Sequence, residues 1–146
     1  MSDEICTGLQ LANFYQDVAE DSARGRRYLP ADAMQRFGVT DEQILARRFD
    51  ANFRAMMEFL VADARARLTR GQRIVELVER DLAATLSLFV KGGFAILDAI
   101  AAQDYDTLRA RPVVSKVVKL RLLGGVLAGK LGAVLRPEPE LSLIHI

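Results

Sequence analysis

The sequence predicts a single all-α domain over residues 1–135. Helix-forming Ala, Leu, Arg, Glu and Gln dominate the chain, and no segment alternates apolar and polar residues as a half-buried strand does. Between residues 50 and 69 the apolar residues return every three or four positions, which marks the buried face of a helix. With 146 residues, 51% of them hydrophobic and 27% charged, the chain has the size and composition of a globular domain.

The first half of the chain predicts three helices. The first extends from about Asp3 to Ala23 and ends near Gly25, since glycine favours the backbone conformation that closes a helix. The second extends from Pro30, a residue suited to a helix start, to Phe37. The third is short and is capped by Thr40, which is followed three residues later by Gln in the pattern of a capping box.

The second half predicts longer helices. One covers about Asp50–Thr69 and should end at Gly71. The next covers Ile74–Gln103, where Gly92-Gly93 leaves open two helices or one kinked helix. A last helix begins at Pro112. The residues expected in the core of this half are Phe53, Met56, Met57, Phe59, Leu60, Val61, Ala64 and Leu68.

Residues 136–146 are expected to be a non-native tail, such as a cloning scar, and are excluded from the fold prediction. This segment contains His145, the only histidine, so a catalytic triad or metal site built on histidine is excluded. The single cysteine, Cys6, excludes an internal disulfide and a CxxC zinc site; it is expected to be buried.

The charge pattern limits the partners and the location of the chain. A net charge of +1 gives no basic face for a nucleic acid. The acidic start does not fit a secretory signal, and four basic residues interrupt the apolar stretch Val113–Leu135, so a cytoplasmic protein is expected. The last helix carries Lys116, Lys119 and Arg121, which form either a solvated face or a peripheral contact with anionic lipid.

One face of the first predicted helix is wholly polar. At about 100° per residue, five side chains fall on this stripe: Gln10, Asn13, Asp17, Asp21 and Arg24. Asp17 and Asp21 lie one turn apart, where two carboxylates repel each other. Apolar residues on the other faces predict a buried helix, so the stripe should face a cavity or a ligand.

Two interpretations of the stripe remain open. A hard divalent cation such as Mg²⁺ would make two desolvated carboxylates tolerable, with Asn13 as a further oxygen ligand and Arg24 pairing with a phosphate. Alternatively, Asp17, Asp21 and Arg24 form an ordinary solvated face with pairs three or four residues apart.

The stripe belongs to a longer pattern that resembles a known family. The pattern is Gln10-Leu-x-Asn13-x-x-x-Asp17-Val-x-Glu20-Asp21, followed by Arg24-Gly25-Arg-x-Tyr28-Leu29-Pro30. It is similar to the second aspartate-rich motif of the squalene and phytoene synthases. Within that family, Phe14-Tyr15-Gln16-Asp17 resembles the bacterial hopanoid-pathway branch, which makes hydroxysqualene from presqualene diphosphate; most other members carry Arg at the position of Gln16.

This resemblance implies a helical isoprenoid (terpenoid) synthase fold in which two Asp-bearing helices face each other across an apolar cavity. Asp17, Asp21 and Tyr28 would be catalytic, Gln10, Asn13 and Arg24 would bind substrate, and Asn13, Asp17 and Asp21 would bind Mg²⁺. The substrate would be presqualene or farnesyl diphosphate, with no organic cofactor and with other hopanoid-pathway enzymes as candidate partners.

The first aspartate-rich motif of that family has no counterpart in the sequence. The chain is therefore expected to be the C-terminal part of a transferase or lyase acting on prenyl diphosphates, inactive without the missing helix. Two other interpretations remain open. One is a head-to-head prenyltransferase that makes squalene or phytoene, and the other is a non-catalytic assembly protein that retains the fold.

Overall fold

The computed structural model describes residues 2–135, and within this range the secondary structure is entirely helical. The all-α prediction is confirmed. The helices are α1 (Ser2–Gln16), α2 (Val18–Ala23), α3 (Ala31–Phe37), α4 (Asp41–Leu45), α5 (Ala51–Val75), α6 (Arg80–Ala102) and α7 (Lys116–Leu135). The predicted tail, 136–146, lies outside the described residues.

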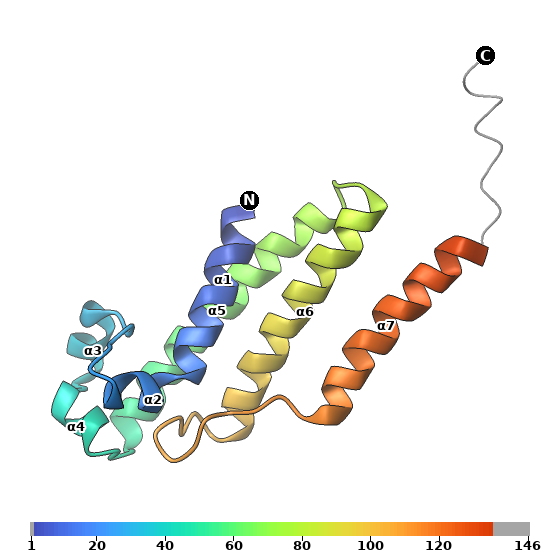
Figure 1. The fold of residues 1–146 in the computed structure, drawn as a ribbon. Coiled ribbons are helices and arrows are strands. Elements are labelled where there is room, and N and C mark those ends of the chain that lie inside the picture. The colour runs from blue at the N-terminus through green and yellow to red at the C-terminus, as the bar shows by residue number, and fades with distance from the viewer. Residues whose placement is uncertain (1, 136–146) are drawn as a thin grey trace.

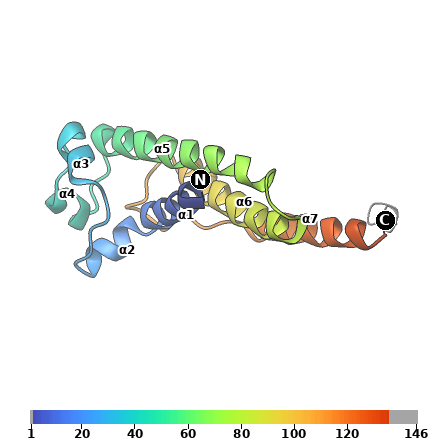
Figure 2. The ribbon, with the colours of Figure 1, turned by 90° about the horizontal axis from the view of Figure 1, so that it is seen from above.

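Three long helices form the centre of the molecule. α1 packs on both α5 and α6, which also pack on each other, and α7 lies along the outer side of α6 (Figure 1). The short helices α2, α3 and α4 gather at one end of α5, as the view from above also shows (Figure 2). The C-terminal end of α1, which leads into Asp17 and α2, therefore meets this cluster of short helices.

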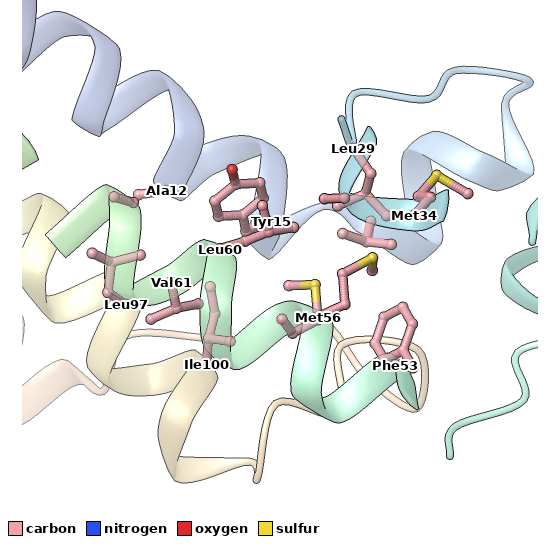
Figure 3. Close-up of a cluster of buried hydrophobic side chains, with 14 of the residues drawn as sticks. Ala12, Tyr15, Leu29, Met34, Phe53, Met56, Leu60, Val61, Leu97 and Ile100 are labelled. Atoms are coloured by element: carbon pink, nitrogen blue, oxygen red, sulfur yellow. The ribbon is translucent and has the colours of Figure 1, made fainter. Parts of the chain in front are cut away.

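The core lies between α1, α5 and α6 and extends under the loop before α3. Figure 3 shows Ala12 and Tyr15 of α1 above the apolar face of α5, with Leu97 and Ile100 of α6 beside it. The face predicted for α5 is confirmed, because its side chains are at most 4% exposed: Phe53, Met56, Met57, Leu60, Val61, Ala64 and Leu68. Phe59 was wrongly predicted in the core. It is 43% exposed and lies under the Arg36 guanidinium.

Glycines predicted to interrupt helices instead lie inside them. α5 continues through Gly71, where an added Cβ would lie 2.5 Å from Cγ1 of Ile5, so this glycine permits α1 to approach. α6 is one continuous helix, and a Cβ on Gly93 would lie 2.8 Å from Cδ1 of Leu68. Packing between helices thus outweighs the low helix propensity of glycine at both positions.

Two local predictions have different outcomes. The cap of α4 is confirmed, because Thr40 Oγ1 accepts a hydrogen bond from the backbone N–H of Gln43 at 3.1 Å. Cys6 was expected to be buried and is exposed.

One helix in the described range, α6, is long and apolar enough to cross a membrane by length and composition. Only 22% of the most apolar stretch of α6 is buried inside the structure. The buried residues of α6 are Val90, Gly93, Leu97 and Ile100. Core helices of globular proteins meet the same criterion, so this is weak evidence for a span.

Candidate metal and diphosphate site

The predicted first helix bends at Asp17. α1 ends at Gln16 and α2 begins at Val18, while Asp17 between them has φ −101° and ψ 16°. The backbone hydrogen bonds continue through the bend, because Asp17 N–H donates to the Asn13 carbonyl at 3.1 Å and Asp21 N–H to the Asp17 carbonyl at 2.8 Å. Asp17 and Asp21 therefore remain one helical turn apart, and the prediction of a single straight helix is corrected to two segments.

The polar stripe lies on the outer side of this bent helix. Gln10, Asn13 and Arg24 are exposed, and Asp17 and Asp21 are half-buried. The opposite side packs into the core through Ile5, Ala12, Tyr15, Val18 and Ala19. Within residues 2–135, the stripe thus faces outward. This differs from the prediction that a buried helix directs the stripe into a cavity, because only the opposite side of the helix is buried.

Asp17 makes an ion pair that the sequence did not predict. Nε of Arg111, in the connector between α6 and α7, donates to Oδ1 of Asp17 at 2.7 Å. The same nitrogen lies 3.9 Å from Oε2 of Glu20. The guanidinium of Arg111 therefore lies beside one carboxylate of the stripe, although Arg111 is 94 positions from Asp17 in the sequence.

Gln16 holds the connector beside Arg111. Its side chain is buried, at 6% exposure, and Nε2 donates to the Pro112 carbonyl at 2.6 Å. This bond satisfies a polar side chain that would otherwise be costly to bury. The residue next to Asp17 is thus bonded to the residue next to Arg111.

Tyr28 and Asp21 line one small cavity at the end of α2. The Tyr28 ring stacks on Phe14 with centroids 4.2 Å apart and planes at 4°. Arg26 and Arg27 line the same cavity, whereas Arg24 does not. Of the predicted site residues, the fold brings Asp21 and Tyr28 together and adds two arginines that sequence reasoning did not single out.

The stripe has donors that suit a hard cation. Asp17 and Asp21 supply carboxylate oxygens and Asn13 an amide oxygen, the ligand type that Mg²⁺ prefers. No group of three or more His, Cys, Asp or Glu in the described range encloses an ion. Because Mg²⁺ commonly keeps waters and takes phosphate oxygens, a two-carboxylate site fits this ion if substrate completes the shell.

The all-helical arrangement defines the fold class as that of the isoprenoid synthases. Its fold is similar to the crystal structure of squalene synthase HpnC from Alicyclobacillus acidocaldarius, with a TM-score of 0.69 and 42% identity. That match covers 71% of this chain and 40% of the other.

The family model described as squalene/phytoene synthase matches residues 1–118. The chain belongs to the squalene/phytoene synthase family. Phytoene synthase 2, chloroplastic, from Solanum lycopersicum is 36% identical over 118 residues, which are 78% of this chain and 37% of that protein. The 15-cis-phytoene synthase of Synechocystis is 33% identical over 117 residues, 78% of this chain and 34% of that protein. The chain thus spans about a third of the length of these curated relatives.

Proposed function

We propose that the complete protein carrying this chain is a Mg²⁺-dependent synthase that converts presqualene diphosphate to hydroxysqualene in hopanoid biosynthesis. The observation that carries the proposal is the pair Asp17 and Asp21, held one turn apart by continuous backbone hydrogen bonds on the outer side of a core helix. Mg²⁺ bound there would neutralise the diphosphate as it leaves.

The other residues of the stripe have roles that follow from their chemistry. Asn13 and Gln10, both exposed on the turns before Asp17, present amide groups that can bind a cation or donate to phosphate oxygens. Arg24 extends the stripe by a further turn with a guanidinium that matches phosphate. Tyr28, stacked on Phe14, lines the same cavity as Asp21.

The hydroxysqualene branch is supported by two features. The identity to the HpnC structure, 42%, exceeds the 33–37% identity to the phytoene synthases. Gln16, at a position where most of the family carries Arg, has a buried partner in the Pro112 carbonyl. The first feature argues against a phytoene synthase, because the more similar structure is that of a squalene synthase. The second feature, the glutamine at position 16, favours the hydroxysqualene branch over a head-to-head prenyltransferase that makes squalene.

The test is a product assay with the complete protein and Mg²⁺. We expect hydroxysqualene from presqualene diphosphate. Squalene or phytoene from farnesyl or geranylgeranyl diphosphate would instead establish the head-to-head reaction and refute the branch assignment. If none of these substrates is consumed, the non-catalytic assembly protein becomes the better account. Residues 2–135 alone should be inactive, because they hold one of the two Asp-bearing helices of the fold.

The same proposal includes a peripheral contact with lipid through α7. Val117 and Leu120 are 59% and 68% exposed, with exposed Lys116, Lys119 and Arg121 beside them. Exposed apolar and basic side chains on one helix favour an anionic membrane surface. The complete protein should sediment with phosphatidylglycerol vesicles more than with phosphatidylcholine vesicles, and Lys116→Glu with Lys119→Glu should reduce this difference. Equal sedimentation with both vesicles would refute the contact.

A further inference from the structure

We propose that Arg111 is an internal counter-cation that competes with the metal for Asp17, and that Gln16 is the positioning residue that keeps it there. The inference rests on the proposed metal-binding role of Asp17, and it concerns residues that this role does not require. It assigns a function to the connector between α6 and α7.

The first step is the ion pair itself. Nε of Arg111 lies 2.7 Å from Oδ1 of Asp17, and the two side chains are 42% and 31% exposed. Glu20, one turn further along, lies 3.9 Å from the same nitrogen and adds a weaker attraction. A cation that binds Asp17 must therefore displace the guanidinium from Oδ1 or bind Oδ2 beside a positive charge. Both routes weaken metal binding.

The second step is what holds Arg111 in place. An exposed arginine would pay side-chain entropy to remain on one carboxylate, which is why such pairs are weak. Here the next residue, Pro112, is buried, and its carbonyl accepts the 2.6 Å hydrogen bond from buried Gln16. Gln16 thus holds the connector to the same turn of helix that carries Asp17, and the backbone of Arg111 starts close to its partner.

The consequence is a metal site whose affinity is set partly by the protein's own arginine. In the absence of diphosphate, Arg111 lowers the affinity of the site for a divalent cation. Loss of the Gln16 hydrogen bond lets the connector move, so it relieves part of the same competition. The effect of Gln16 therefore depends on the presence of Arg111, which a purely structural role would not require.

The test measures Mn²⁺ binding to the complete protein by electron paramagnetic resonance, without diphosphate and at fixed ionic strength. We expect Arg111→Gln to tighten Mn²⁺ binding about two- to fivefold, the range that an exposed ion pair provides. Gln16→Met, which keeps the side-chain length and removes the donor, should give part of this gain. Arg54→Gln is the matched control, because it removes an exposed arginine with a 2.7 Å bond to Asp104 and should leave Mn²⁺ binding unchanged.

The double variant decides the role of Gln16. In the Arg111→Gln background, Gln16→Met should change Mn²⁺ affinity no further. An equal effect in both backgrounds would overturn the positioning role, and unchanged affinity in Arg111→Gln would overturn the competition. If Mn²⁺ binding requires Asp17 but ignores Arg111, this inference alone fails. Binding that is absent, or unaffected by Asp17→Asn, removes the proposed function as well.

Discussion

The backbone N–H of Asp21 donates to the carbonyl of Asp17 at 2.8 Å, so the two aspartates are joined by a helical hydrogen bond across the bend between α1 and α2. This bond keeps their side chains one turn apart on the outer face of the helix, although the helix axis changes direction there. The relative position of the two carboxylates is thus a property of the local backbone.

Neutralising either aspartate should therefore remove a metal ligand without unfolding the helix. In the complete protein we expect Asp17→Asn and Asp21→Asn each to lower kcat by at least about 100-fold, because one preorganised electrostatic contact to the departing charge is lost. Asp104→Asn is a matched control, since it removes a carboxylate that pairs with Arg54 at 2.7 Å. Wild-type kcat in both motif variants would contradict the metal assignment.

Two adjacent glycines in α6 should respond differently to alanine. A Cβ on Gly93 would lie 2.8 Å from Cδ1 of Leu68 and 3.0 Å from Cδ2 of Leu9, whereas a Cβ on Gly92 meets nothing within 4 Å. Both changes gain the same helix propensity, so their difference reports the packing. Gly93→Ala should be less stable than Gly92→Ala by about 1–3 kcal/mol in urea unfolding. Equal stability would contradict the close approach of α6 to α1 and α5.

The cap of α5 predicts a pH-dependent loss of stability. Asp50 Oδ1 accepts the Phe53 N–H at 2.8 Å, and this hydrogen bond holds the pKa of the Asp50 carboxyl below its ordinary value. The ionised Asp50 carboxyl contributes to the free energy of unfolding above its unfolded-state pKa, and this contribution is lost as pH falls through its folded-state pKa. Asp50→Ala should cost about 0.5–2 kcal/mol at neutral pH. The Tm difference between wild type and Asp50→Ala should shrink as pH falls through the folded-state pKa of Asp50, and a difference that stays constant with pH would argue against ionisation of the cap.

Tyr15 predicts a loss of stability at high pH. Burial, with a smaller effect from the Asp63 carboxylate, raises the pKa of the Tyr15 hydroxyl to about 12 from its ordinary value of 10.0. The contribution of the protonated Tyr15 hydroxyl to the free energy of unfolding is complete below the unfolded-state pKa and is lost as pH rises through the folded-state pKa. This loss of stability therefore falls between about pH 10 and 12. Tyr15→Phe should remove that component from unfolding curves. The wild-type minus variant absorbance difference should titrate near pH 12, and a midpoint near pH 10 would contradict the burial.

The side-chain contacts of the site were only partly predictable. The sequence predicted that Asp17 and Asp21 lie one turn apart on one helix face, because residues three and four apart share a face of a helix. It did not predict that this face points outward. Arg111 was not singled out as a partner of Asp17, since the pair joins elements 94 residues apart and nothing in their local patterns connects them. The turn after Ala23 is closed locally, because Gly25 has φ 72° and the Arg26 N–H donates to the Asp21 carbonyl at 2.8 Å. Arg26 and Arg27 were missed because the cavity that they line with Asp21 also takes residues from α4, which the local sequence pattern does not bring there.

The sequence by itself determined the helical class, the apolar face of α5, the cap at Thr40 and the spacing of Asp17 and Asp21. These features depend on the number of residues per helical turn and on contacts between residues within one or two turns of each other. Only the tertiary structure decided the bend at Asp17, the continuation of α5 and α6 through Gly71 and Gly93, and the Asp17–Arg111 pair. The close approaches at Gly71 and Gly93 and the Asp17–Arg111 pair join segments distant in sequence, and local propensity carries no information about which surfaces will be in contact.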